Sequence, residues 1–278
     1  MPRARPLASL CAMRIRWLEA SEARFADYAR LFPELGVSDP LPAPADWLAN
    51  MGPDLVFLEL DGAVVGYGYA QALASSGYVR HVVIGPQARG KGLGRELMHE
   101  LRRRLAAGGC RSWQLNVKVD NVPAIALYRS LGMEPDYRTW VLRVPAPAGL
   151  PLPPSPALRF SESPASSDAA LEREFEVAAG LLARHRAKPA TRLFLFERDG
   201  TPVALAPFDP HFPGCFPFRL REAACARAVL ERLLTFVPAE RTYLQLVLER
   251  DEPSARLLLS AGASLVFEIQ HLQGPLDG

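Results

Sequence analysis

The chain has 278 residues, of which 49% are hydrophobic and 22% are charged, and its formal net charge is +2. These proportions exclude a disordered or fibrous chain and are typical of a folded protein long enough for two domains. So small a net charge gives no reason to expect nucleic acid or an anionic membrane surface as a partner. No run of about 18 apolar residues occurs, so the sequence predicts no membrane-spanning helix.

The cysteines show no pattern that would hold a metal or a disulfide framework. Cys11, Cys110, Cys215 and Cys225 form no Cys-x-x-Cys pair, and a chain of this length needs no covalent cross-links. We expect ordinary thiols in a reducing cytoplasm, and no metal. The apolar run 7–12 is short for a signal peptide, so residues 1–12 are interpreted as a disordered tail.

Strands and helices alternate in the first half of the chain. Apolar patterns predict strands at 14–18, 55–60, 64–70, 78–84, 113–119 and 139–144. Helices are predicted after the N-cap candidate Ser21, around Trp47, from about Leu93 to Ala107, and at 124–131. The dipeptide Asp61-Gly62 predicts a hairpin between two of the strands.

A proline-rich segment then interrupts the pattern. Proline fixes φ and lacks a backbone donor, so neither a helix nor a central strand is expected to run through residues 145–156. We predict an extended linker that separates a domain at 13–144 from a second domain at 157–278.

The second domain repeats the order of the first. Strands are predicted at 158–161, 193–197, 203–207, 243–248 and 265–271, and helices at 168–186, 223–236 and 254–260. At a constant offset of 130 residues, Pro123, Leu127, Ser130 and Gly132 recur as Pro253, Leu257, Ser260 and Gly262. The matched order and the offset indicate an internal duplication.

The chemistry is concentrated in the segment Arg89-Gly90-Lys91-Gly92-Leu93-Gly94, which lies between a predicted strand and a predicted helix. Glycines let the backbone turn tightly and leave N–H groups uncovered. The following helix adds the positive end of its dipole, and Arg95 adds a further charge, so the segment suits a pyrophosphate. It is neither a Walker loop, because no Ser or Thr follows Lys91, nor a dinucleotide fingerprint, because hairpin strands surround it.

The segment resembles the GNAT superfamily of N-acetyltransferases, whose pyrophosphate motif Arg/Gln-x-x-Gly-x-Gly/Ala is matched by Arg89, Gly92 and Gly94. Residues 121–133 resemble the family's second motif, Asn-x-x-Ala-x-x-Leu-Tyr-x-x-x-Gly-Phe, with Met133 in place of Phe. The resemblance covers 13–144 in element order and 78–133 in residue detail. It implies an α/β (α+β) fold of two tandem domains, each a mixed, mostly antiparallel sheet with helices on both faces.

The resemblance also implies a substrate and a mechanism. Acetyl-CoA would lay its pyrophosphate on the N–H groups of residues 90–95 and its pantetheine arm along Val82, Val83 and Ile84, which splay from the neighbouring strand. Asn121 would contact the arm, and Tyr128 would act as the acid at the thioester sulfur.

The general base is less clearly indicated. Some family members place Glu where this chain has Asn116, and others use an acid on the strand before the loop, where this chain has Arg80 and His81. His81 has a suitable reference pKa, and His99 is expected to be solvated. A structural His81 and a water chain remain alternatives.

The second domain lacks the matching residues. Its loop, 218–222, has no glycine, and Leu258 and Asp251 stand at the positions of Tyr128 and Asn121. We interpret it as a degenerate domain without a cofactor site, which packs on the first domain, shapes its cleft or dimerises. The segment 208–213, rich in proline and aromatic residues, is expected to be a surface loop or a loop that lines a cleft.

The acceptor cannot be read from the sequence. Glu34, Asp39 and Asp46 would suit a cationic amine, and a small molecule, a peptide N-terminus and a protein lysine all remain open. We expect a monomer or a homodimer that transfers acetyl to a primary amine by direct attack. The alternatives are a non-catalytic acyl-CoA-binding or sensing module and a transferase that uses a larger acyl-CoA.

Overall fold

The computed structural model describes residues 14–36, 41–73, 75–188, 190–211 and 214–276, and the tail expected at 1–12 lies outside them. The chain divides into two compact units. Unit 1 comprises Met1–Val117, Asn121–Pro135 and Leu272–Gly278, and unit 2 comprises Lys118–Asp120 and Asp136–His271. Within the described residues, no helix combines the length and the apolar character needed to cross a membrane.

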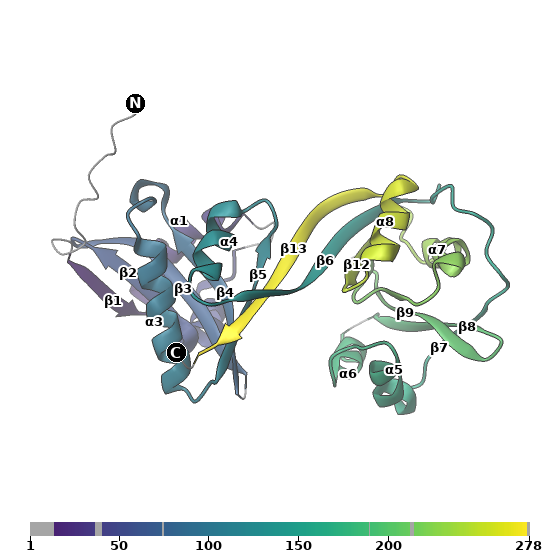
Figure 1. Ribbon diagram of the computed structural model, residues 1–278, viewed down its shortest axis with the longest axis horizontal. Helices are drawn as coiled ribbons and strands as arrows, with labels where there is room; N and C mark the ends of the chain where they lie inside the picture. The colour runs from purple at the N-terminus through teal and green to yellow at the C-terminus, as the bar shows by residue number, and fades with distance from the viewer. Residues whose placement is uncertain (1–13, 37–40, 74, 189, 212–213, 277–278) are drawn as a thin grey trace. The chain divides into compact units, whose positions relative to one another are not determined.

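Unit 1 is built on a mixed sheet (Figure 1). Its strands are β1 (Ile15–Glu19), β2 (Leu55–Leu60), β3 (Ala63–Leu73), β4 (Ser76–Ile84) and β5 (Ser112–Lys118), paired in this order. All neighbours are antiparallel except β4 and β5, which are parallel. The long helices are α1 (Phe25–Leu31), α2 (Pro44–Met51), α3 (Leu93–Ala107) and α4 (Val122–Arg129). One core packs α1 and α2 against the sheet, and a second core packs α3 and α4 against the other face.

Two glycines bring α3 unusually close to the sheet. A Cβ atom on Gly68 of β3 would lie 2.9 Å from the Leu101 side chain, and one on Gly77 of β4 would lie 2.5 Å from that of Leu105. Any larger residue would therefore force the Leu101 or Leu105 side chain, or the helix that carries it, to shift. Leu97, Leu101 and Leu105 recur at every fourth residue of α3, and all three are buried in the core against the sheet.

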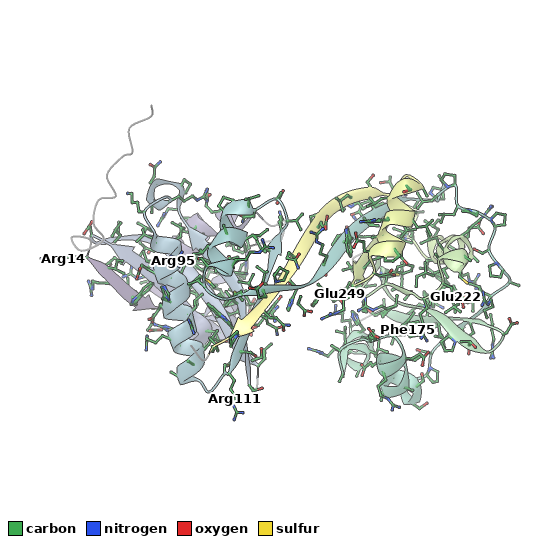
Figure 2. All side chains as sticks on the ribbon, in the orientation of Figure 1. Arg14, Arg95, Arg111, Phe175, Glu222 and Glu249 are labelled. Atoms are coloured by element: carbon green, nitrogen blue, oxygen red, sulfur yellow. The ribbon has the colours of Figure 1, made fainter. Side chains whose placement is uncertain are left out.

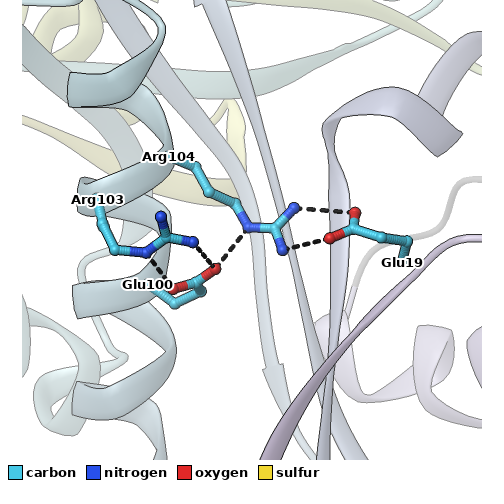
Figure 3. A network of polar contacts seen from close by, with 4 residues as sticks. All are labelled: Glu19, Glu100, Arg103 and Arg104. Atoms are coloured by element: carbon cyan, nitrogen blue, oxygen red, sulfur yellow. Dashed lines mark hydrogen bonds and ion pairs between the residues drawn. The ribbon is translucent and has the colours of Figure 1, made fainter.

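An ion-pair network fastens α3 to the edge strand β1 (Figure 3). Glu100, only 5% exposed, accepts from Arg103 at 2.7 and 2.8 Å and from Arg104 at 2.7 Å. Arg104 also holds both carboxylate oxygens of Glu19 on β1, at 2.6 and 3.0 Å. The hydrogen bond from Arg103 holds the pKa of Glu100 below its usual range, and Arg104 does the same for Glu19.

The last described residues of the chain complete unit 1. Strand β13 (Ser264–Pro275) begins in unit 2, but Leu272 and Leu276 are buried in the core that contains α3. The Leu276 N–H donates to the Arg111 carbonyl at 2.9 Å, and the Leu276 carbonyl accepts from Arg102 at 3.0 and 3.3 Å. The units differ from the expected bounds 13–144 and 157–278, because the chain returns to unit 1 from Leu272 on. Residues 136–144 and the expected linker 145–156 belong to unit 2, so this segment does not separate the two units.

Unit 2 has the same construction. Its strands pair in the order β6 (Glu134–Pro145), β12 (Tyr243–Glu249), β10 (Gly214–Cys215), β9 (Thr201–Asp209), β8 (Arg192–Arg198) and β7 (Arg159–Glu162), with β11 (Arg219–Leu220) also beside β9. Helices α5 (Asp168–Glu174) and α6 (Leu181–Arg186) pack on one core, and α7 (Ala226–Leu234) and α8 (Glu252–Ser260) on the other. The expected α/β (α+β) fold class is confirmed: the strands form a mixed sheet, and in each unit helices pack on both of its faces.

The repeat extends to irregular details. The β2–β3 hairpin shifts register between Leu58 and Glu59, and the β8–β9 hairpin shifts at the corresponding point, between Phe196 and Glu197. Helices α4 and α8 are both capped at their start by a side chain. The Ala124 N–H donates to Asn121 Oδ1 at 3.3 Å, and the Ser254 N–H donates to Asp251 Oδ1 at 3.1 Å.

The prediction of a single helix at 168–186 is wrong. The chain ends α5 at Glu174 and begins α6 at Leu181, and Gly180 between them has φ +76°. The carboxylate of Glu172 accepts from the N–H groups of Gly180 and Leu182, both at 2.9 Å. A side chain of the first helix therefore satisfies the start of the second, which apolar spacing alone does not predict.

Leu272→Ala should destabilise unit 1 by about 2–5 kcal/mol, the usual cost of a cavity at a fully buried leucine. Urea unfolding followed by tryptophan fluorescence measures this, because Trp17, Trp47 and Trp113 lie in unit 1. The matched control is Leu265→Ala on the same strand, where the side chain is 47% exposed. Equal, small effects of the two substitutions would show that the C-terminal residues do not stabilise unit 1.

Glu100→Gln should cost about 1.5–3 kcal/mol at neutral pH, because it removes a charged acceptor from three hydrogen bonds. The folded-state pKa of Glu100 is lowered, so its contribution is present above the unfolded value of about 4.3 and disappears as pH falls through the folded value. Thermal unfolding of both proteins between neutral and acidic pH tests this, with Glu231→Gln at the surface as control. A stability difference that persists at the lowest pH would contradict it.

Candidate active site

Strands β4 and β5 run together only at their beginnings. Their parallel pairing extends from Ser76–Ser112 to Val79–Leu115 and, in the described part of the chain, ends there. Strand β4 stays paired with β3 as far as Ile84. On that side Tyr69 faces His81 and Ala70 faces Val79, so Arg80 is an extra residue that bends β4. The edge of Val82–Ile84 that would face β5 is thus released from the sheet.

The glycine loop follows this edge directly. Gly85 is tied to β3 through its N–H, which donates to the Val65 carbonyl at 2.8 Å. Gly90 and Gly92 have φ +74° and +80°, a region that side chains disfavour. Among the described residues, backbone donation resumes with Arg95, whose N–H bonds the Gly92 carbonyl at 2.9 Å. The intervening N–H groups lie at the start of the fifteen-residue helix α3, so they form a site for an anion.

The arginines beside the loop brace it. Arg89 donates to the Ile84 carbonyl at 3.0 Å and pairs with Glu34 at 2.6 Å. Arg95, labelled in Figure 2, donates to the Ser130 hydroxyl at 2.8 Å. Lys91 is exposed, and no ion pair of its ammonium group occurs among the described residues.

The acids expected on the acceptor side are differently placed. Glu34 is neutralised by Arg89 and is not a free carboxylate for an amine. Asp46 is exposed in the first turn of α2, and Asp39 lies outside the described residues.

Helix α4 packs directly against the start of α3. A Cβ atom on Gly94 would lie 3.3 Å from the Leu127 side chain, so a larger residue would require Leu127 to shift by a few tenths of an ångström. Leu93 is buried and can offer a ligand only its backbone. Tyr128 is 8% exposed, and burial raises its pKa to about 12. Among the described residues its hydroxyl has no hydrogen-bond partner.

His81 lies on the opposite face of the sheet from Tyr128. Residues two apart on a strand point to the same face, so His81 faces the same side as Val83, which belongs to the core of α1 and α2. Tyr128 belongs to the core of α3 and α4 on the other face. Half-buried His81 has Nδ1 3.4 Å from the Tyr67 hydroxyl, and the ring centroids of Tyr69 and Phe32 lie 5.4 and 6.2 Å away. The two candidate catalytic residues thus flank the released edge of β4 from opposite faces.

The remaining sequence candidates have structural contacts. Asn116 donates to the Tyr78 hydroxyl at 2.9 Å, and Asn121 caps α4. His99 is exposed on α3, as expected. Sequence reasoning missed the aromatic residues around His81. The alternation of Gly66 and Gly68 with Tyr67 and Tyr69 could have indicated them. A glycine inside a strand often marks a place where a ligand or another part of the backbone comes close.

In unit 2, ionic side chains occupy the place that corresponds to the loop. Arg219 bonds the Phe175 carbonyl at 3.2 Å and Glu249 at 3.0 Å, and Arg221 pairs with Glu174. They line a cavity of about 220 Å³ to which Glu176 and Asp251 add further carboxylates. Phe175 and Glu249 are labelled in Figure 2.

Comparison with known proteins agrees with this geometry. Residues 17–133 match the model of a family described as the acetyltransferase (GNAT) family. Mycothiol acetyltransferase from Streptomyces bingchenggensis (strain BCW-1) is 35% identical over 125 residues, which are 42% of this chain and 38% of the relative. The match therefore spans well under half of that protein.

Solved structures resemble nearly the whole chain. A GCN5-related N-acetyltransferase from Sphaerobacter thermophilus has a TM-score of 0.66 and 16% identity, covering 94% of this chain and 96% of that one. A GCN5-related N-acetyltransferase from Kribbella flavida has a TM-score of 0.52 and 18% identity, covering 95% and 72%. Identities this low show a shared fold.

Proposed function

We propose that this chain, whose residues 17–133 match the model of the acetyltransferase (GNAT) family, transfers an acetyl group from acetyl-CoA to a primary amine. The observation that carries the proposal is the released edge of β4. It leads directly into a loop at the start of α3 whose N–H groups bond no backbone carbonyl in the described part of the chain. A long ligand with an extended amide arm and a pyrophosphate has complementary groups in the same order.

Binding would use backbone rather than side-chain groups. The pyrophosphate would accept from N–H groups of residues 90–95, and the amides of the pantetheine arm would pair with Val82–Ile84 as an additional strand does. Arg89 and Arg95 would hold the loop in shape through Glu34 and Ser130. Lys91 would supply the free positive charge, and Asn121 would fix the start of α4 beside the arm.

The reaction would proceed by direct attack within a ternary complex. The neutral amine nitrogen forms a bond to the thioester carbonyl carbon, and a main-chain N–H of the released edge stabilises the developing oxyanion. The C–S bond then breaks and the electron pair leaves with the CoA sulfur. Tyr128 donates its proton to that sulfur, and the proton of the attacking amine passes to His81 or to water.

The pKa values decide what each residue must do. At about 12, the pKa of Tyr128 keeps the phenol protonated at neutral pH, as a general acid requires. Transfer to a thiolate with a reference pKa of about 8.5 costs roughly 5 kcal/mol, so a strong hydrogen bond to sulfur precedes complete transfer. An alkyl amine with pKa about 10.4 needs roughly 4 kcal/mol to lose its proton at neutral pH. The general base must therefore help to remove that proton, at a free-energy cost similar to that of the proton transfer from Tyr128.

The acceptor would enter on the face of α1 and α2, where His81 lies among Phe32, Tyr67 and Tyr69. Aromatic faces attract an ammonium group without a carboxylate, which suits a site where Glu34 is neutralised. We propose a small-molecule or peptide amine as acceptor. A relative named mycothiol acetyltransferase supports acetyl transfer as the reaction.

Unit 2 would bind no second acetyl-CoA. The carboxylates of Glu174, Glu249 and Asp251 lie where phosphates would have to bind, and fully buried Leu258 stands at the position of Tyr128. One cofactor molecule per chain is therefore expected.

Gly90→Glu should weaken acetyl-CoA binding by on the order of a hundredfold, because a carboxylate would face the pyrophosphate. Isothermal titration calorimetry measures affinity and stoichiometry. Gly62→Glu is the matched control, since both glycines have positive φ, +74° and +86°, and a Cβ atom at either would meet nothing within 4 Å. Binding that survives Gly90→Glu, or two sites per chain, would refute the proposed cofactor site.

Tyr128→Phe should keep acetyl-CoA affinity and lower kcat by roughly ten- to a thousandfold, the range for a general acid or slightly below it. Release of free thiol with a panel of amines measures turnover, and Tyr243→Phe in unit 2 controls for loss of a phenol. His81→Ala should likewise lower kcat without weakening cofactor binding.

The outcomes separate the alternatives. Unchanged turnover in Tyr128→Phe would leave Tyr128 a purely structural residue. A wild-type protein that binds acetyl-CoA and acetylates no amine would be a binding or sensing module. Turnover only with a longer acyl-CoA would show that the acyl donor is not acetyl-CoA.

A further inference from the structure

A second cavity lies in unit 2, away from the loop that corresponds to the glycine loop. It has a volume of about 380 Å³ and is lined by His185, Lys188, Pro207, Asp209, Phe216 and Val247. Pro207 is paired with Leu193 as Tyr69 is paired with Leu55 in unit 1. The cavity is therefore the unit 2 counterpart of the aromatic surroundings of His81.

His185 in this cavity is a buried histidine. The side chain is 4% exposed, and neither ring nitrogen has a hydrogen-bond partner among the described residues. Burial lowers the pKa of His185, so the imidazole is neutral at neutral pH and presents one donor and one acceptor. A buried polar group without partners destabilises a protein, and a ligand that supplies them accounts for its presence.

Opposite charges lie beside this ring. Lys188 follows His185 by three residues, and Asp209 ends β9. Lys188 lowers and Asp209 raises the pKa of His185, so both charges act on the ring. They form no ion pair with each other within the described residues, where Asp209 accepts from the His211 N–H at 2.9 Å. A cation and an anion are thus both available to a ligand.

The rest of the lining is apolar. Pro207 and Val247 are buried, and Phe216 presents its ring at 70° to His185, with centroids 5.9 Å apart. The cavity combines a polar end with both charge signs and an apolar wall that accepts a hydrocarbon chain.

We propose that this cavity binds a free α-amino acid with an apolar side chain. The carboxylate of the ligand would pair with Lys188, its ammonium group with Asp209, and its side chain would lie against Phe216, Pro207 and Val247. His185 would complete the hydrogen bonds of the headgroup. Because the site lies in the unit with carboxylates in place of the phosphate loop, it binds without turnover.

Calorimetry of the full chain with L-leucine, without acetyl-CoA, tests the proposal. We expect saturable binding of one molecule. 4-Methylpentanoate, which lacks the ammonium group, and isoamylamine, which lacks the carboxylate, should bind at least tenfold more weakly. His185→Leu and Asp209→Asn should each weaken L-leucine at least tenfold. Arg184→Met, on the exposed surface of the same helix, should not.

Absence of saturable heat with millimolar L-leucine would overturn the proposal. So would binding that survives Asp209→Asn, a substitution of similar shape that serves as second variant if His185→Leu fails to fold. Binding abolished by His81→Ala, at the proposed acceptor face of unit 1, would assign L-leucine to unit 1 as an acceptor and also overturn it. Failure of acetyl transfer alone would leave these results unchanged, so the two proposals fail separately.

Discussion

The parting of β4 from β5 beyond Val79 is the constraint on which unit 1 depends. A sheet that stays paired has no backbone groups left for a ligand. The extra residue Arg80 bends β4, while β3 holds its other edge. Gly66 makes this hold possible, because a Cβ atom there would lie 2.6 Å from the Val83 carbonyl. The strand therefore leaves one neighbour without loosening from the other.

The position of α3 turns this gap into a site. The helix must start where β4 ends and remain close to the sheet, so glycines at 68 and 77 set its distance and the Glu100 network fixes it to β1. The C-terminal residues close the same core from a segment that is remote in sequence. Anion binding at the loop is thus a property of the whole unit, although its donors are backbone groups of a few residues.

The two units separate scaffold from chemistry. Hairpin register, register shift and side-chain caps are repeated, while the residues at the ligand positions differ. Where unit 1 has glycines, unit 2 has Arg219 and Arg221 paired with acids. Where unit 1 has His81 among aromatic rings, unit 2 has a cavity with a buried histidine whose ring nitrogens bond none of the described residues. A fold held by backbone pairing and core packing tolerates such exchanges because neither depends on these side chains.

The sequence by itself determined the local elements. Gly90 and Gly92 and the motif at 121–133 act within a few residues, so their spacing predicts the loop, the helices beside it and the family resemblance. Spacing also predicts the succession of strands along unit 1 and most of those in unit 2, but it misses the two-residue strands β10 and β11. It fails at 168–186, because the break depends on Glu172 bonding N–H groups eight and ten residues away.

Only the tertiary structure decided which distant groups meet. Arg89 pairs with Glu34, 55 residues away, and Arg102 binds the Leu276 carbonyl across 174 residues. No periodicity in the chain encodes such partners, because they depend on how cores pack and on which charges packing leaves together. The same holds for His185. Whether its ring nitrogens meet hydrogen-bond partners depends on the cavity around it, and a single histidine in a sequence does not reveal this.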